Sequence, residues 1–405
     1  MKIDNKKFFP IYILNIINWL SFSLLIPVYP LLIKQYWEPA IVLWIFTAIF
    51  SFFQMFWWTI MWSLSDKYWR RPILVLTQLW TFFSWLIIAI AYFVPDKSFL
   101  WIVSIPILVI FLSRAIDGIT WWNESVANAY VSDISNKEER TIVFWYISAI
   151  FWFTLIVWTW LWAFSMASNY WYLWTAIMGA FFSFIALIYI IYKLKESLPE
   201  EKRNKEIKLN FKELNIISQI NKWIKKDIYK WLFIMKLFVF SIFSMYVTTF
   251  SLYIIDVYKF DPINIWYYLS FTWMFIIINQ WFVIKRIIAK IWESNSMLLW
   301  IILVSLWFLW MWFSKNIYLF TVVYYFVNLW FTSLMTITQW MLSKNASEKE
   351  QWEIMGISSS LSAFIFIYWP VLWWLLYWFN HEYFYYTLWS LMIFSFISYF
   401  KFIKK

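Results

Sequence analysis

Apolar runs recur along the whole sequence, and they constrain the fold more than any other feature. Each run is about twenty residues long, roughly the number of helical residues that crosses the hydrocarbon core of a bilayer. The chain is 64% hydrophobic, 26% aromatic and only 14% charged. The sequence therefore predicts an all-α polytopic membrane protein with twelve transmembrane helices.

The runs fall into two sets of six. We expect an N-terminal six-helix bundle over residues 1–192 and a C-terminal six-helix bundle over residues 231–405. Residues 193–230 between them are charged and polar, and predict a cytoplasmic linker that is partly an amphipathic helix on the membrane surface.

The basic residues indicate the orientation. Of 33 Lys and Arg, only four lie in the loops expected on one side, while 27 lie at the termini or in loops on the other. Cytoplasmic loops carry an excess of Lys and Arg, so we expect both termini in the cytoplasm and the chain in the inner (plasma) membrane. The uneven distribution of the net charge of +11 thus sets the topology and favours contact with anionic lipid. It does not indicate binding to nucleic acid.

A short polar stretch separates the expected second and third helices. It runs Met61-Trp62-Ser63-Leu64-Ser65-Asp66-Lys67-Tyr68-Trp69-Arg70-Arg71-Pro72. It resembles the signature of the major facilitator superfamily, Gly-x-Leu-(Ala/Ser)-Asp-(Arg/Lys)-x-Gly-Arg-Arg. Trp62 and Trp69 occupy the two glycine positions, whereas the other signature positions match.

The resemblance implies two pseudo-symmetric halves with a substrate between them near the midplane. It further implies a gating latch, in which Asp66 faces the start of helix 11 and Arg70 or Arg71 pairs with Asp133. Arg140 would complete the acid–base pair around the next loop. The alternative is that these charges serve only to set topology.

The expected fourth helix, about Phe99 to Val131, carries charges inside an apolar run. Arg114, Asp117 and Glu124 are three and seven residues apart, so they share one helix face. With Trp121 and Trp122 taken as glycine, this segment resembles helix 4 of tetracycline/proton antiporters. A membrane carboxylate beside a cation is suited to proton coupling, although a static Arg114–Asp117 ion pair is the alternative.

Neutral polar side chains in other runs are candidates for lining a substrate cavity, with packing between helices as the alternative for each. These candidates are Asn15, Asn18, Gln54, Asn123, Asn279, Gln280, Asn328 and Gln339. Lys236, in the expected seventh helix, is predicted to extend its ammonium group to the cytoplasmic interface.

Tryptophan is abundant and glycine scarce. The chain has 37 Trp and 3 Gly, whereas an average composition of about 7% glycine would give roughly 28. We therefore hypothesise that most Trp are glycine codons, read in a genetic code where UGA encodes glycine. The alternative is a protein that is genuinely rich in Trp.

The sequence thus predicts a carrier similar to the tetracycline-type drug exporters, exchanging a small amphipathic compound for protons by alternating access. Two alternatives are a metabolite facilitator or symporter for a sugar or organic acid, and a receptor or scaffold that transports nothing. We found no nucleotide-binding loop, metal cluster or nucleophile triad, so we expect no enzyme activity, cofactor or metal. The expected partners are a small-molecule substrate, protons and lipid, and the expected state is a monomer.

Overall fold

The computed structural model describes most of the chain and some isolated positions between the longer ranges. Those ranges are residues 5–23, 40–99, 103–120, 123–135, 168–198, 200–202, 227–260, 293–314, 316–345, 351–379 and 383–403. The chain divides into two compact units, Met1–Leu214 and Asn215–Lys405, and each is described by itself.

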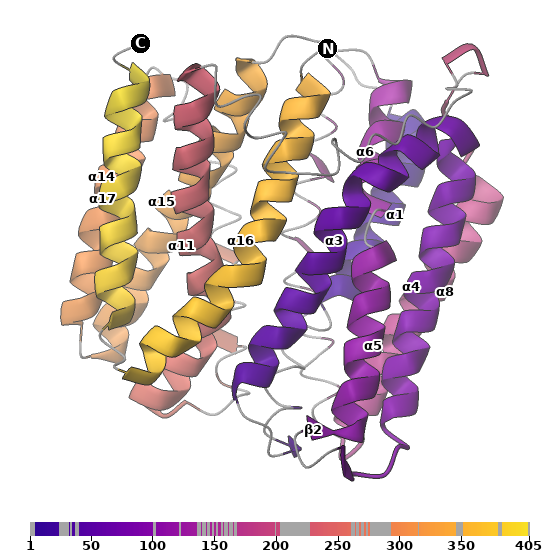
Figure 1. Ribbon diagram of the computed structural model, residues 1–405, viewed down its shortest axis with the longest axis horizontal. Helices are drawn as coiled ribbons and strands as arrows, with labels where there is room; N and C mark the ends of the chain where they lie inside the picture. Colours follow the sequence, from indigo (N-terminus) through magenta and orange to yellow (C-terminus); the bar gives the residue numbers. More distant parts are fainter. Residues whose placement is uncertain are drawn as a thin grey trace. The chain divides into compact units, whose positions relative to one another are not determined.

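Where the structure describes it, the first unit is a bundle of helices with a small antiparallel pair of strands (Figure 1). Its elements are α1 (Asn5–Ser23), α3 (Ala40–Tyr68), α4 (Arg70–Ala91), β1 (Ser98–Phe99), β2 (Val103–Ser104), α5 (Ile105–Thr120), α6 (Asn123–Ile134), α8 (Trp171–Lys193) and the 3₁₀ turn η1 (Glu200–Lys202).

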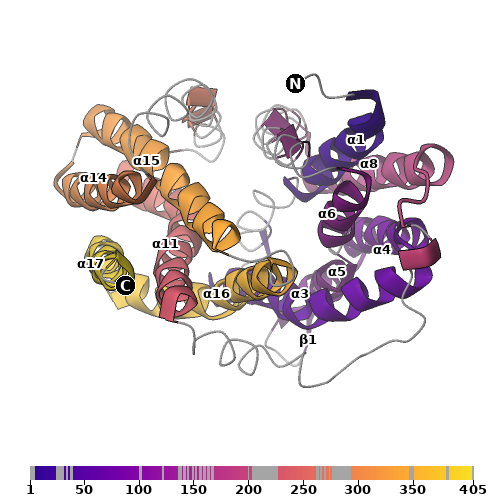
Figure 2. The same ribbon diagram turned by 90° about the horizontal axis from the view of Figure 1, so that it is seen from above.

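The second unit is also helical in the part that the structure describes. Its helices are α11 (Asp227–Tyr258), α14 (Glu293–Phe313), α15 (Ile317–Lys344), α16 (Gln351–Phe379) and α17 (Tyr383–Ile403). Figure 2 shows α11 among α15, α16 and α17, all three of which it contacts.

Four described helices contain segments long and apolar enough to cross a bilayer, namely Arg70–Ala91, Trp171–Lys193, Ile228–Met245 and Ile317–Met335. The chain is therefore a multi-pass membrane protein. The predicted total of twelve helices includes segments outside the described residues and stays a prediction, as do the predicted bundle and linker boundaries.

Helix α8 shows how a spanning helix is oriented in its bundle. Trp174, Ile177, Phe181 and Phe184 follow one another at helical spacing and are exposed. The opposite face is buried and carries small residues, including Gly179. Small residues allow helices to approach closely, while large apolar side chains face lipid at no cost.

Neutral hydrogen bonds tie α4 to its neighbours. Gln78 Nε2 donates to the Ser183 carbonyl oxygen of α8 at 3.2 Å. On the α5 side, the hydroxyls of Ser84 and Ser113 lie 2.9 Å apart. Because these groups are buried, the bonds satisfy polar atoms that would otherwise be costly in a membrane.

The start of the expected fourth helix differs from the prediction. Helix α5 begins at Ile105, and it is preceded by an antiparallel hairpin in which Phe99 faces Val103. Pro106 is the second residue of α5, and proline is tolerated in the first helical turn because its missing N–H has no partner there. Phe99, Val103 and Ser104 are therefore not part of this helix.

Helices α3 and α5 approach closely at Gly118. A Cβ atom at this position would lie 2.5 Å from the carbonyl oxygen of Phe50. Only glycine fits against a backbone at that distance. The close contact brings α3 against the part of α5 that carries the buried charges described below.

Candidate functional site

A single residue separates α3 from α4. Helix α3 continues to Tyr68 and α4 begins at Arg70, so the break between them consists of Trp69 alone and most of the polar stretch is helical. Its backbone has φ 68° and ψ 158°. Glycine takes this conformation freely, whereas it is strained for a residue with a Cβ atom.

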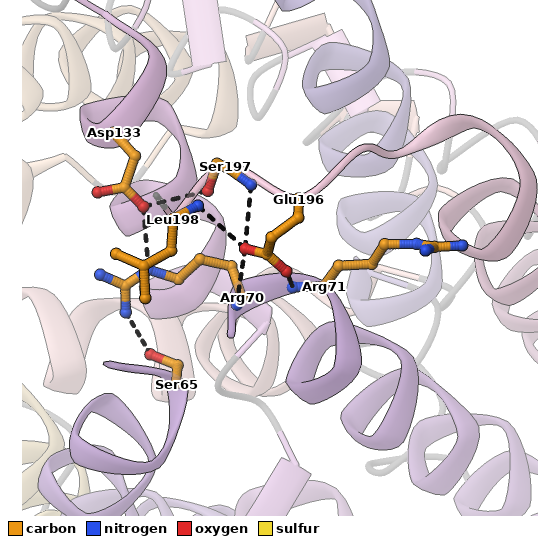
Figure 3. Close-up of polar contacts among 7 residues, drawn as sticks. All are labelled: Ser65, Arg70, Arg71, Asp133, Glu196, Ser197 and Leu198. Atoms are coloured by element: carbon orange, nitrogen blue, oxygen red, sulfur yellow. Dashed lines mark hydrogen bonds and ion pairs between the residues drawn. The ribbon is translucent and has the colours of Figure 1, made fainter. Parts of the chain in front are cut away.

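Glu196 caps the N-terminus of α4 from a distant part of the sequence (Figure 3). Its Oε1 accepts a hydrogen bond from the backbone N–H of Arg70 at 3.1 Å, and its Oε2 accepts one from Arg71 at 3.0 Å. Oε1 also accepts from the backbone N–H groups of Ser197 and Leu198, each at 3.0 Å. The N-terminus of a helix carries partial positive charge, which favours a carboxylate here.

The side chain of Arg70 links three elements. It is buried, and its Nε donates to Asp133 Oδ2 of α6 at 3.1 Å. One terminal nitrogen donates to Ser65 Oγ of α3 at 2.5 Å. Ser197 Oγ donates to the same Asp133 oxygen at 3.1 Å. We call Ser65, Arg70, Asp133, Glu196 and Ser197 the Arg70 network.

The network resolves which arginine meets Asp133. The sequence left open whether Arg70 or Arg71 pairs with Asp133. In the structure, Arg70 forms the ion pair with the Asp133 carboxylate. The Arg71 guanidinium instead donates to the carbonyl oxygen of Ile191 near the end of α8. The side chain of Asp66 and all of Arg140 lie outside the described residues, so their predicted roles stay predictions.

A second set of charges lies inside α5. Arg114 and Asp117 are buried and form an ion pair one helical turn apart. The Arg114 guanidinium also lies 5.3 Å from the centre of the Phe50 ring of α3, within cation–π range. Glu124, predicted to share this face, has its side chain outside the described residues.

The predicted cavity amides divide into three groups. Asn15 and Asn328 are buried, and each donates from Nδ2 to the carbonyl oxygen four residues earlier in its own helix, at 2.8 Å. Asn18 and Gln54 are partly buried. The remaining four have side chains outside the described residues: Asn123, Asn279, Gln280 and Gln339.

Lys236 does not extend to an interface, contrary to our expectation. Its side chain is 2% exposed, and it faces into the second unit rather than out of it. Its Nζ donates to Ser358 Oγ of α16 and lies 4.4 Å from the centre of the Phe240 ring. Burial on the face shared with Leu232 and Val239 explains the difference, because the stem would have to leave the core to reach water.

Comparison with known families now identifies the chain. A sequence profile of the Major Facilitator Superfamily matches residues 11–370. The chain belongs to this superfamily. Members of this superfamily are transporters of small molecules rather than enzymes.

Two curated relatives are tetracycline resistance proteins. The class H protein of Pasteurella multocida is 26% identical over 156 residues, which is 38% of this chain and 36% of the relative. The class D protein of Salmonella ordonez is 27% identical over 150 residues, 36% of this chain and 35% of the relative. The matched part thus spans about a third of each relative's length.

Solved structures show the same fold over nearly the whole chain. The human organic anion transporter MFSD10 (TETRAN) superposes with a TM-score of 0.77 at 16% identity, covering 99% of this chain and 100% of its own. The nucleoside transporter NupG gives 0.73 at 11% identity, covering 98% and 99%. A peptide transporter in complex with alafosfalin gives 0.74 at 13%, covering 97% and 93%.

Proposed function

We propose that this superfamily transporter exports a small amphipathic compound in exchange for protons, by alternating access. The buried Arg114–Asp117 pair carries the proposal. Ionisable residues inside a membrane are costly and are by default assigned to a transport pathway or proton relay. The partial similarity to tetracycline resistance proteins supports export.

Asp117 is the proposed proton carrier, and Arg114 its partner. A carboxylate next to a guanidinium holds its proton weakly, and it accepts one more readily when the cation moves away. A conformational change that separates the pair would therefore couple proton uptake to transport. The cation–π contact of Arg114 with Phe50 links this pair to α3, so a shift of α3 against α5 would alter it.

The Arg70 network is the proposed latch of the first half. It connects α3, α4, α6 and the segment after α8 through charged hydrogen bonds, which are about twice as strong as neutral ones. We propose that these bonds hold the cytoplasmic end of the half in one arrangement, and that alternating access requires them to rearrange. The predicted contact of Asp66 with helix 11 would connect the latch to the second half.

Proton coupling is tested with the full-length protein in liposomes containing the pH-sensitive dye pyranine. Doxycycline, ethidium and Hoechst 33342 are the probes, each added under an imposed pH gradient. With the wild-type protein, we expect the transport of at least one probe to be accompanied by proton movement, seen as a change in pyranine fluorescence. Asp117→Asn should abolish the proton signal, whereas Asp96→Asn, which changes an exposed loop acid, should not.

Two outcomes would contradict the proposal. One is a proton signal in Asp117→Asn equal to that of the wild type. The other is transport of a labelled sugar or organic acid that does not respond to the proton gradient, which would favour a metabolite facilitator.

A further inference from the structure

Two lysines that are distant in sequence meet at one aromatic ring of the second unit. Lys230 Nζ lies 5.4 Å from the centre of the Trp231 ring, and Lys401 Nζ lies 4.8 Å from the same centre. Both distances are within cation–π range. Lys230 and Trp231 lie near the beginning of α11, and Lys401 is the third residue from the end of α17. We call these three residues the Trp231 site.

The Trp231 site lies at the boundary of a membrane-spanning segment. Lys230 is the third residue of the apolar segment Ile228–Met245, which is long enough to cross a bilayer. Lys401 is exposed, whereas Lys230 and Trp231 are half-buried. Tryptophan rings at the end of a span lie at the level of the lipid headgroups, and lysine side chains there extend their ammonium groups toward the interface. The depth of the site is therefore that of a phospholipid headgroup.

An aromatic contact continues the line of the site into the spanning part of the same two helices. Phe238 follows Trp231 by seven residues in α11, and Phe394 precedes Lys401 by seven residues in α17. Seven residues are about two helical turns, or roughly 10 Å. The Phe238 and Phe394 rings stack with their centres 5.3 Å apart. The two contacts are thus in register along a pair of neighbouring helices, which Figure 2 shows side by side.

The α17 side of this line is open to lipid. Ile397 and Phe394 precede Lys401 by four and seven residues, so the three side chains share one helix face. Ile397 and Phe394 are exposed. Large apolar side chains on the outside of a membrane helix face the acyl chains. A lipid whose headgroup lies at Lys401 therefore has an apolar surface for its acyl chains directly below.

The charge around the site is positive. Asp227, the first residue of α11, supplies one negative charge three residues before Lys230. It is outnumbered by the two lysines of the site and by further lysines that the sequence carries next to the two helix ends: Lys222, Lys225, Lys226, Lys404 and Lys405. Clusters of lysines beside a membrane helix attract anionic headgroups. Phosphate oxygens also accept charge-assisted hydrogen bonds from ammonium groups.

From this arrangement we propose that the Trp231 site binds an anionic phospholipid. Its phosphate lies between Lys230 and Lys401, and its acyl chains run along α17 past Ile397 and Phe394. The two lysines supply the charge, so the site does not depend on whether residue 231 is tryptophan or glycine. The inference is independent of the transported compound and of proton coupling, because the site faces lipid rather than a substrate pathway.

Binding is tested by native mass spectrometry of the purified, delipidated full-length protein in detergent. Phosphatidylglycerol and phosphatidylcholine with identical acyl chains are added at equal concentration, because the second carries a cation that cancels the charge of its phosphate. In the wild type we expect roughly tenfold tighter binding of phosphatidylglycerol for the first bound lipid. The double variant Lys230→Gln with Lys401→Gln should lose most of this preference. Lys230→Arg with Lys401→Arg should keep it, since arginine retains the charge.

The matched control is the double variant Lys193→Gln with Lys195→Gln, which removes two exposed lysines around the end of α8 in the first unit. It has the same net charge as the glutamine variant of the site and should keep the wild-type preference. Equal losses in the two double variants would show a diffuse attraction to net charge and overturn the site. A wild type that binds both lipids equally would overturn it as well.

A soluble compound separates a lipid from a free phosphate ligand. Glycerol 3-phosphate carries the phosphate without acyl chains, so at equal concentration it should not displace phosphatidylglycerol from the wild type. Retention of phosphatidylglycerol supports a lipid that is held by its headgroup and its acyl chains together. Displacement would show that the two lysines bind the phosphate alone, and it would overturn the assignment to a phospholipid.

Discussion

Glu196 holds the backbone N–H groups of Arg70 and Arg71 with its two carboxylate oxygens, at 3.1 and 3.0 Å. Residues about 125 positions apart in sequence thereby form one helix cap. The residue before the helix, Trp69, makes no side-chain cap hydrogen bond. The segment after α8 therefore caps the N-terminus of α4, so the stability of this helix end depends on where that segment lies.

Replacing Glu196 by alanine should destabilise the protein by about 1 kcal/mol, the usual cost of losing a helix cap. The thermal unfolding midpoint of the purified protein measures the effect. Glu200→Ala is the control, because Glu200 is an exposed acid in η1. Equal midpoints for the two variants would contradict the capping role.

Arg70→Lys should slow transport at least tenfold while leaving expression in the membrane unchanged. A guanidinium presents donors in a fixed fork and reaches Asp133 and Ser65 together, whereas a single ammonium group cannot match that geometry. Transport by proteoliposomes at matched protein content is the measurement. Lys67→Arg serves as control, and a full rate in Arg70→Lys would count against the latch.

Asp117→Asn should destabilise the protein by about 3 to 5 kcal/mol, since it leaves the buried Arg114 without its carboxylate. The double variant Arg114→Met with Asp117→Leu should recover most of that stability, because an apolar pair of similar size is often neutral. It should nevertheless transport nothing. Denaturant titration of the three proteins gives the comparison, and a single variant as stable as the wild type would show that the pair is not needed for folding.

Trp69→Gly should stabilise the protein by about 1 to 3 kcal/mol, the cost of holding a residue with a Cβ atom in a sparsely populated conformation. Trp80→Gly is the control. Trp80 is exposed in the interior of α4, where glycine costs about 1 kcal/mol relative to alanine. If Trp69→Gly is less stable than the wild type, the backbone at residue 69 does not require glycine.

The same position tests the genetic-code hypothesis. Trp300 and Trp330 give a second reason to doubt tryptophan. Their ring centres lie 4.6 Å apart, and neither buried indole N–H has an acceptor among the described residues. A buried donor without an acceptor costs about 1 to 3 kcal/mol. Tandem mass spectrometry of the protein from its native host should show glycine at 69, 300 and 330, and tryptophan there would refute the hypothesis.

The membrane class and the contact between Arg70 and Asp133 were accessible from sequence for different reasons. Long apolar runs indicate helices that are surrounded by lipid, so the sequence alone shows that the chain is a membrane protein. Arg70 and Asp133 were found because their sequence context matches a known signature. The choice between Arg70 and Arg71 needed coordinates, since neighbouring residues point in different directions from the first turn of a helix.

Two other residues were missed because their surroundings are not local. Glu196 lies among several charged residues at the start of the expected linker, and nothing in that segment marks it as a cap. Lys236 was expected to reach water, since it is the sixth residue of the predicted C-terminal bundle and so lies close to the expected cytoplasmic interface. Its burial depends on how α11 packs against α16, which periodicity does not determine.

The single-residue break between α3 and α4 has a mechanical consequence. Two long helices joined through one non-helical residue leave no slack, so the angle between them is set by the two backbone dihedrals of residue 69. A substitution at residue 69 that shifts these two dihedrals therefore changes the angle between α3 and α4 along their whole length.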